Sequence, residues 1–341
     1  MKILGIETSC DETAVAVVEN GRCVLSNVVA TQVEMHAKYG GIVPELASRQ
    51  HMTAILPVLE QALRQADTDL SEINGIAVTH GPGLAGALLV GVSSAKGLAL
   101  ARHLPLIGIN HLEGHVYATW LEDYEPEANP GFPVICLIAS GGHTDLILMQ
   151  GHGEFRVVGR TRDDAAGEAF DKAARVLELG FPGGPAIQKI AEQSFAATEP
   201  FTRPVVKDSL DFSFSGLKSA MVRRAQEKGL YPKKGDDPLD PNIVGGLATE
   251  FQAAIVDTMV TKTVNAAADY NVNGIVLGGG VAANALLRQE MIRRSPVEVL
   301  VPSPMLCTDN GAMIAAAAHF RMGDNVRYEW DLDVVPNLGL G

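Results

Sequence analysis

Apolar runs of strand length recur along the chain, and two of the polar segments between them are alike. Ser9–Thr13 and Ser140–Thr144 each lie between two such runs. Short apolar runs separated by polar turns predict β-strands joined as hairpins. We therefore predict the same hairpin at two places in the chain. The flanking runs are Ile3–Ile6, Ala14–Val18, Val134–Ala139 and Leu146–Met149.

A second pattern is also repeated. Asn74–Val78 leads into the glycine-rich Gly81–Leu89, and Asn273–Leu277 leads into Gly278–Leu287. Both predict a strand, a glycine-rich turn and a helix. Repetition of this kind indicates a duplicated architecture. Because 131 residues separate Ser9 from Ser140 but 199 separate Asn74 from Asn273, the second half is longer by 68 residues.

The extra residues fall at about 161–270, where apolar residues follow helical spacing in Ala165–Glu178 and Ala248–Ala268. We predict an α/β fold of two related halves, 1–128 and 129–341, with a helical insert in the second. Proline and glycine residues near 125–133 predict the linker. Two facing halves would enclose a cleft, which is the usual place for a ligand.

Composition supports a folded protein and limits its partners. The 341 residues are 47% hydrophobic and 20% charged, enough for about two domains with cores. A net charge of −13 argues against broad nonspecific binding of nucleic acid. Six basic residues nevertheless gather in Lys218–Lys234, where Glu227 is the only acid. This stretch is a candidate contact for a phosphate-rich partner; otherwise it is a solvated helix and loop.

Other features favour a cytoplasmic protein. No apolar run reaches the roughly 18 residues that span a membrane, since polar residues at Ser93–Lys96 interrupt the best candidate. The acidic residues after Ile6 do not fit a signal peptide. The four cysteines show no CxxC spacing, which argues against a zinc knuckle or a disulfide framework. We interpret Cys10 as structural, because the neighbouring Asp11 and Glu12 disfavour its thiolate.

The strongest candidate chemistry is a pair of histidines. His111 and His115 lie four residues apart in a predicted helix, so they share one face and suit Zn²⁺ or Fe²⁺. Glu113 falls on the other side of that helix, unlike the general base of a metalloprotease. Asp309, at the start of a later predicted helix, is the candidate third ligand. The alternatives are packed or surface histidines and an aspartate that caps a helix.

Two glycine-rich turns and one acidic turn are weaker candidates. The segments Ser140–Thr144 and Gly278–Gly280 suit backbone N–H groups that bind an anion, or else a plain hairpin and close strand–helix packing. Neither has the spacing of a dinucleotide-binding or P-loop motif. Asp11 and Glu12 are candidates for a base or a phosphate-site carboxylate, with an exposed polar turn as the alternative.

Taken together, these residues resemble the tRNA threonylcarbamoyladenosine transferase family, formerly called O-sialoglycoprotein endopeptidases, nearly end to end. The resemblance rests on ten segments: Gly5–Thr13, His36–His51, Thr79–Gly91, Asn110–His115, Ala139–Thr144, Asp163–Lys172, Phe181–Pro185, Phe212–Lys218, Gly278–Asn284 and Cys307–Ala315.

The resemblance implies a duplicated actin-like fold, shared with sugar kinases, and a metal bound by His111, His115 and Asp309. The expected metal is Fe²⁺, with Zn²⁺ as the alternative. It also implies an adenylate or ATP-type nucleotide in the cleft. The residues implied to contact the threonylcarbamoyl-AMP substrate are Ile138, Ala139, Ser140, Gly141, Gly142, Asp171, Gly184 and Asn284. Many members have an acidic residue where this chain has Gln188, so a ribose contact there is not implied.

The implied reaction moves a threonylcarbamoyl group from its adenylate to the exocyclic amine of adenosine 37 in tRNAs that read codons beginning with A, and releases AMP. We assign Asp11 and Glu12 the catalytic roles. Implied partners are the tRNA and, in bacteria, a shorter inactive paralogue and a small ATPase; no membrane is implied. The alternatives are a small-molecule kinase, a metalloprotease and a nucleotide-sensing protein without chemistry.

Overall fold

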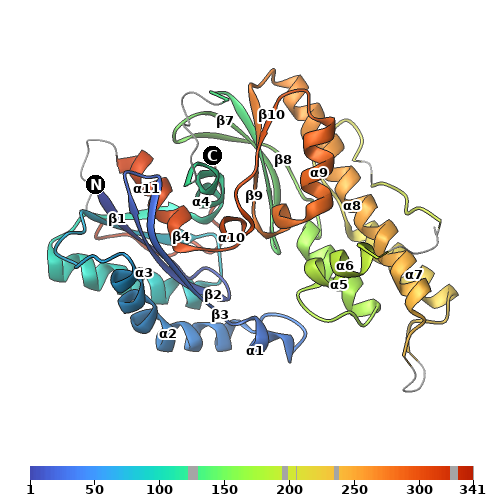
Figure 1. Cartoon of the computed structure of the whole chain (residues 1–341), viewed down its shortest axis with the longest axis horizontal. Coiled ribbons are helices and arrows are strands. Elements are labelled where there is room, and N and C mark those ends of the chain that lie inside the picture. The colour runs from blue at the N-terminus through green and yellow to red at the C-terminus, as the bar shows by residue number, and fades with distance from the viewer. Residues whose placement is uncertain (122–129, 194–198, 205, 234–237, 323–328, 341) are drawn as a thin grey trace. The chain divides into compact units, whose positions relative to one another are not determined.

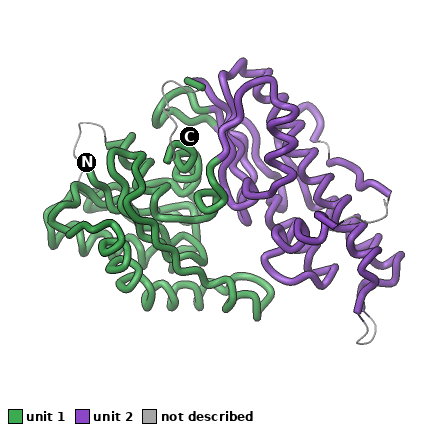
Figure 2. Tube along the Cα trace, viewed as in Figure 1, with its two compact units in different colours: residues 1–131, 149–156, 302–341 green, residues 132–148, 157–301 purple. Residues whose placement is uncertain are grey.

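The computed structural model describes the chain except for residues 122–129, 194–198, 205, 234–237, 323–328 and 341. The chain divides into two compact units (Figure 2). Unit 1 comprises residues 1–131, 149–156 and 302–341, and unit 2 comprises residues 132–148 and 157–301. The described residues of 302–341 thus pack with the N-terminal part of the chain, although sequence order places them in the second half.

Unit 1 is built on a five-stranded sheet of order β3-β2-β1-β4-β5 (Figure 1). β1 pairs antiparallel with β2 and parallel with β4, and β4 pairs parallel with β5. The carboxyl ends of β1, β4 and β5 therefore meet at one edge, where ligands bind in open α/β sheets. The strands are β1 (Lys2–Glu7), β2 (Glu12–Glu19), β3 (Cys23–Thr31), β4 (Gly75–Gly81) and β5 (Leu106–Asn110).

The two faces of this sheet are covered by different helices. Leu4 and Ile6 of β1 belong to a core shared with α2 and α3. Gly5, between them, points to the opposite face and meets the backbone of α11. This alternation decides which residues of β1 can reach α4 and α11. The helices of unit 1 are α1 (Val33–Ala37), α2 (Pro44–Gln65), α3 (Ala85–Arg102), α4 (His111–Tyr117), α10 (Pro304–Cys307) and α11 (Gly311–Met322), with the 3₁₀-helix η1 (Ala118–Leu121).

The second sheet has the order β10-β9-β6-β7-β8, and β6, β9 and β10 run parallel. Its strands are β6 (Val134–Ala139), β7 (Thr144–Gly151), β8 (Glu154–Arg160), β9 (Gly274–Gly278) and β10 (Glu298–Leu300). The helices of unit 2 are α5 (Ala166–Val176), α6 (Gly183–Ala191), α7 (Ser215–Glu227), α8 (Pro241–Asp269) and α9 (Ala285–Arg294), with the 3₁₀-helix η2 (Gly280–Ala283).

The strand orders confirm the predicted duplication. Read from β3 and from β8, the two sheets have the same order, with both predicted hairpins and both strand–turn–helix units in equivalent places. Helices α1 and α2 connect β3 to β4, whereas α5 to α8 connect β8 to β9. The helical insert is therefore confirmed in the described residues. The predicted halves, 1–128 and 129–341, correspond to the two copies of the repeat rather than to the two compact units. Most of the predicted linker, 125–129, lies outside the described residues.

One helix among the described residues, α8, is long and apolar enough to cross a membrane by length and composition. This differs from the expectation that the best candidate is the stretch interrupted at Ser93–Lys96. In α8, 72% of the most apolar window is buried inside the protein, and the helix contacts β6, β9, α6 and α9. Burial on this scale is typical of a core helix, which is apolar on most sides.

We predict that Gly311→Ala destabilises the protein. A Cβ at Gly311 would lie 2.6 Å from the backbone N of Ala16 and 2.8 Å from the O of Gly5, so backbone atoms would have to move. Overpacking of this kind costs about 1–3 kcal/mol, and the midpoint of thermal unfolding should fall.

The matched control is Gly97→Ala in α3, where no described atom lies within 4 Å of the added Cβ. There alanine should raise the midpoint, because glycine inside a helix is less favourable by about 0.5–1 kcal/mol. Equal midpoints for Gly311→Ala and the wild type would contradict the close-packing argument.

Candidate functional site

The two histidines are placed by a short, well-capped helix. Asn110 ends β5, and its side chain accepts a hydrogen bond from the N–H of Leu112 at 2.9 Å, which fixes the start of α4. His111 and His115 then lie on one face of α4, with ring centroids 4.7 Å apart. Both side chains are buried. The predicted shared face is confirmed, and the alternative of surface histidines is wrong.

Asp309 joins the histidines from the loop between α10 and α11. Its Oδ1 lies 3.1 Å from Nε2 of His115 and 3.6 Å from Nε2 of His111. The cap of α11 is the neighbouring Asn310, whose Oδ1 accepts from the N–H of Met313 at 3.0 Å. The alternative role of Asp309 as the helix cap is therefore wrong. All three side chains belong to unit 1.

The donor set fits a divalent cation. One ligand atom from each of His111, His115 and Asp309 lies within 4.8 Å of the other two. Neither ring nitrogen of His115 has a hydrogen-bond partner among the described residues, although both are buried. Nε2 faces Oδ1 of Asp309 in an ion pair but makes no hydrogen bond, and a cation between these two atoms would give Nε2 a partner. Two histidines and one carboxylate are a common set for Fe²⁺ and Zn²⁺.

Sequence analysis missed one buried residue at this site, Glu7. Its Oε2 lies 3.1 Å from Nδ1 of His111, and its side chain is fully buried. Burial disfavours the charged forms of Glu7 and His111, but the charge of each residue favours the charged form of the other. Together with Asp309, the Glu7 carboxylate raises the pKa of His111 to about 9, and the pKa of Glu7 is held below its usual value. The signal in the sequence was a charged residue closing an apolar strand.

The acidic turn after β1 also lies in this region. Asp11 is buried, so the alternative of an exposed polar turn is wrong for this residue, whereas Glu12 is partly exposed. Burial, followed by the negative charges of Asp309 and Asp11, raises the pKa of Glu12 to about 10. A protonated Glu12 cannot accept a proton, so a role as base requires the positive charge of a cation nearby. Burial also raises the pKa of the Cys10 thiol well above its usual value, as expected for a structural cysteine.

Glu113 lies on the other side of α4, as predicted. Its Oε1 accepts a hydrogen bond from Nε of Arg321 on α11 at 2.9 Å, and the Glu113 side chain is fully buried. Burial raises the pKa of Glu113 to about 7, and Arg321 partly opposes this shift. A carboxyl group engaged with α11 cannot serve as a general base beside the histidines, which argues against a metalloprotease.

In unit 2, most residues implied to bind substrate lie at or after the ends of two neighbouring strands, β6 and β9, whereas Asp171 lies on α5 and Gly184 on α6. Ile138 of β6 pairs with Gly278 of β9, so the turns that follow these parallel strands lie side by side. The turn after β6 contacts the start of α5, where the N–H of Gly167 donates to the O of Ser140 at 3.1 Å. Ile138 and Ala139 are fully buried as whole residues, so their side chains belong to the core of unit 2.

The glycines here are of two kinds. The backbone requires glycine at 183 and 279. A Cβ on Gly183 would lie 2.5 Å from Cα of Asp171. Gly279 has a φ of +86°, and a Cβ there would clash with the O of Ala139. At Gly141, Gly142 and Gly184 a Cβ would meet free space, and their φ values are ordinary. The fold does not require glycine at these three positions, which favours the close approach of a ligand over a plain turn.

The polar side chains of this set are already engaged within the fold. Oδ1 of Asp171 accepts from the N–H of Gly183 at 2.7 Å. Asn284 caps α9 through the N–H of Leu287 and donates to Oε1 of Gln252 at 2.9 Å. Gln188, the departure from the family pattern, accepts from the N–H of Ala285 at 3.0 Å. These contacts position α6 and α9 beside the turns.

The basic stretch is less free than the sequence suggested. Arg224 donates to the backbone O of Glu199 and of Pro200 and stacks 4.0 Å above the ring of Phe201. Lys233 pairs with Glu178 at 2.9 Å. Lys234 and the acidic 236 and 237 lie outside the described residues. Arg223 and Lys228, which are exposed on α7 and at its end, are the better candidates for phosphate contacts.

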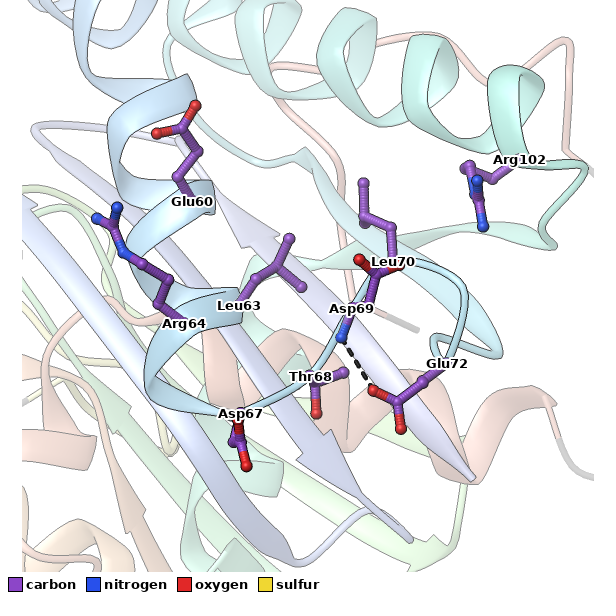
Figure 3. Close-up of a pocket in the computed structure, with 9 residues that line it drawn as sticks. All are labelled: Glu60, Leu63, Arg64, Asp67, Thr68, Asp69, Leu70, Glu72 and Arg102. Carbon is purple, nitrogen blue, oxygen red and sulfur yellow. Dashed lines mark hydrogen bonds between the residues drawn. The ribbon is translucent and has the colours of Figure 1, made fainter.

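A pocket of 840 Å³ lies elsewhere in unit 1, between the ends of α2 and α3 (Figure 3). It contains none of the predicted site residues. Two of its acidic side chains are engaged locally: Oε2 of Glu72 accepts from the N–H of Asp69 at 3.0 Å and Glu72 pairs with Lys2, while Oδ1 of Asp69 accepts from Ser71. We therefore assign it no part in the chemistry.

Comparison with known sequences gives one consistent result. A sequence model of the family described as tRNA N6-adenosine threonylcarbamoyltransferase matches residues 23–316. A protein of that name from Thermomicrobium roseum is 54% identical, with 100% of this chain and 97% of the relative covered. Another from Symbiobacterium thermophilum is 51% identical, with 99% of this chain and 97% of the relative covered.

Solved structures support the fold. HypF from T. kodakarensis superposes with a TM-score of 0.62 at 14% identity, covering 97% of this chain and 49% of HypF. Component A of (R)-2-hydroxyglutaryl-CoA dehydratase from Acidaminococcus fermentans gives 0.53 at 15% identity, covering 94% of this chain and 98% of that one. The predicted duplicated actin-like fold is confirmed. From the sequence match along its length, the chain belongs to the tRNA N6-adenosine threonylcarbamoyltransferase family.

Proposed function

We propose that this enzyme transfers a threonylcarbamoyl group to the N6 amine of adenosine 37 in tRNAs that read codons beginning with A. The donor is threonylcarbamoyl-AMP, a mixed anhydride. The amine attacks the carbamoyl carbon, the bond from that carbon to the phosphate oxygen breaks, and AMP leaves. The amine loses one proton as the new C–N bond forms. The observation that carries this proposal is membership of the family over the whole chain.

We propose His111, His115 and Asp309 as the ligands of one divalent cation, Fe²⁺ or alternatively Zn²⁺. The buried Nε2 of His115, which makes no hydrogen bond, and the two approaches of Asp309 to the histidines support this choice. When bound, such a cation supplies Lewis acidity that orients and polarises oxygens of the threonylcarbamoyl group. The raised pKa of Glu12 also fits, because burial and the negative charges of Asp309 and Asp11 disfavour its ionised form, which a nearby cation would favour.

We propose the turn Ser140–Gly142 and its neighbours in unit 2 for the adenylate. Backbone N–H groups in a turn without side chains approach a phosphate closely and stabilise the charge that develops on it as AMP leaves. The glycines at 141, 142 and 184, which packing does not require, support this role. Asp171 and Asn284 are proposed substrate contacts as well, although their hydrogen bonds to Gly183 and Gln252 serve the fold.

We propose Asp11 or Glu12 as the acceptor of the amine proton. An aromatic amine is weakly acidic and loses its proton only as the new bond forms, so a carboxylate must be held near it. Asp11 lies in the turn that follows β1 and is buried, while the partly buried Glu12 opens β2. The N–H of Gln32 anchors the turn by donating to the O of Asp11 at 3.0 Å.

The remaining proposals concern partners. Position 37 lies next to the anticodon and is unpaired, so presenting its base costs little unstacking. We propose a shorter inactive paralogue and a small ATPase as protein partners in bacteria, and a cytoplasmic location. Four apolar side chains on α2 and α3, each more than half exposed, support a protein partner. They are Met52, Leu56, Leu89 and Leu100.

The proposed reaction is tested by mass spectrometry of tRNA nucleosides after incubation with threonylcarbamoyl-AMP and the partner proteins. The wild type should form the modified adenosine and AMP in equal amounts. Of the variants Asp11→Asn and Glu12→Gln, the one that replaces the proton acceptor should lower the single-turnover rate by roughly 10²–10⁴-fold. Near-normal rates in both variants would remove the assignment of the base, and no modified adenosine from the wild type would remove the reaction.

Metal binding is a separate prediction. His111→Ala and His115→Ala should each abolish stoichiometric retention of Fe²⁺ or Zn²⁺ after dialysis, measured by elemental analysis. A single missing ligand from a set of three leaves too few donors to hold the cation. His103→Asn is the control, because His103 ends α3 with a φ of 52°, a conformation that asparagine tolerates. Retention by both alanine variants at the level of the control would refute the ligand set.

For tRNA binding, the structure changes which residues to vary. Arg223→Ala with Lys228→Ala should lower the salt dependence of tRNA affinity by about 0.7–0.9 in log–log slope for each phosphate that is no longer neutralised. Arg224 is left unchanged, since it packs on Phe201. The charge-preserving pair Arg223→Lys with Lys228→Arg should keep the wild-type slope. If the alanine pair also keeps that slope in the assembled complex, this stretch does not contact tRNA.

A further inference from the structure

We propose that Glu7 is a positioning residue for the metal centre. It receives the Nδ1 proton of His111 and so presents the other ring nitrogen, Nε2, without a proton to a cation shared with Asp309. The inference rests on the proposed metal site and adds a residue that lies behind a ligand. Metal-binding histidines commonly donate their second ring N–H to a carboxylate, which fixes both the tautomer and the ring orientation.

The position of Glu7 follows from the sheet. It ends β1 on the same face as Gly5, which is the face covered by α11. Its Oε2 lies 3.1 Å from Nδ1 of His111, while Nε2 of the same ring lies 3.6 Å from Oδ1 of Asp309. The ring of His111 is thus held between a carboxylate on each side.

The other partners of Glu7 make it an acceptor. The backbone N–H of Ser9 donates to Oε1 at 2.5 Å, and a backbone N–H can only donate. The hydroxyl of Thr79 on β4 donates to Oε2 at 2.5 Å. Both carboxylate oxygens are therefore occupied by donors, and the contact with His111 is satisfied when Nδ1 carries the proton.

Among the described residues, Ser9 offers the one competing group at that nitrogen. Its Oγ lies 3.2 Å from Nδ1 of His111. A hydroxyl donates or accepts as its surroundings require, so it follows the tautomer of the ring rather than setting it. A fully buried carboxylate has no such freedom. The carboxylate of Glu7 is therefore the group that fixes the tautomer.

His115 provides an internal contrast. It is equally buried, yet its Nδ1 has no hydrogen-bond partner in the described part of the chain. Of the two histidines, His111 is the one oriented by a carboxylate on the far side of its ring. The inference accordingly concerns His111 alone, and it predicts different proton signals for the two rings.

Glu7→Gln tests the role because an amide cannot satisfy all three neighbours. With its oxygen toward Ser9, the amide NH₂ faces Nδ1 of His111 and drives the proton to Nε2, which blocks the cation. If the amide oxygen instead faces His111, the amide NH₂ faces the N–H of Ser9, and the hydrogen bond from Ser9 is lost because both groups are donors. Thr79→Val and Ser9→Ala are matched controls, because each removes one neighbouring hydroxyl and keeps the carboxylate.

The first measurement is Zn²⁺ affinity of the full chain by competition with a chelator, with thermal unfolding recorded in parallel. Glu7→Gln should bind Zn²⁺ about 10–100-fold more weakly than the wild type, and the two controls should lose less than the lower end of that range. Equal Zn²⁺ affinity of wild type and Glu7→Gln would overturn the inference. The inference would also be overturned if Thr79→Val lost as much Zn²⁺ affinity as Glu7→Gln, because that result would indicate a merely structural role for Glu7.

The second measurement needs no variant of Glu7. In wild-type protein labelled with ¹⁵N-histidine and loaded with Zn²⁺, long-range proton–nitrogen correlations report which ring nitrogen carries the proton. His111 should show a protonated Nδ1 and a metal-bound Nε2. A His111 bound through Nδ1 would overturn the role of Glu7 while leaving the metal site intact. Failure of the wild type to bind Zn²⁺ would overturn both.

Discussion

The chemistry of unit 1 depends on how closely helix α11 approaches strands β1 and β2. Gly311 opens this helix against the backbone of Gly5 and Ala16, with no room for a side chain on either glycine. Asp309 lies two residues before Gly311, so the same contact sets where its carboxylate lies. Gly114 gives α4 a similarly close approach to α11, where an added Cβ would lie 2.8 Å from Cδ1 of Ile314. A larger residue at these glycines would separate Asp309 from the histidines.

This close packing also concentrates charge in a buried place. Glu7, Glu12 and Asp309 converge on a region in which burial alone disfavours a carboxylate, and the pKa of Glu12 is raised to about 10 as a result. Glu7 avoids this outcome through its three donors, which hold its pKa below the usual value. Asp309 forms ion pairs with the two histidines. A positive charge near Asp309 would favour the ionised form of Glu12, and this electrostatic argument supports the proposed cation.

Unit 2 has the same topology but different chemistry. Its sheet has the strand order of the first, but the turns at the ends of β6 and β9 offer backbone groups and glycines rather than buried acids and histidines. Packing explains Gly183 and Gly279, whereas nothing in the described fold requires glycine at 141, 142 or 184. The two sheets therefore share one strand order, while the residues at their strand ends differ, and the proposed metal and adenylate sites follow this difference.

Periodicity and spacing were enough to predict the duplication, the helical insert and the shared face of His111 and His115, because all three depend on neighbours close in sequence. Spacing also placed Glu113 away from that face, and resemblance to a family supplied the function. The approach of Asp309 within 3.1 Å of His115, the engagement of Arg224 with Phe201 and the place of Glu7 behind His111 came only with the tertiary structure. Those contacts join residues separated by up to about two hundred positions, and they depend on backbone approach distances that local sequence patterns do not encode.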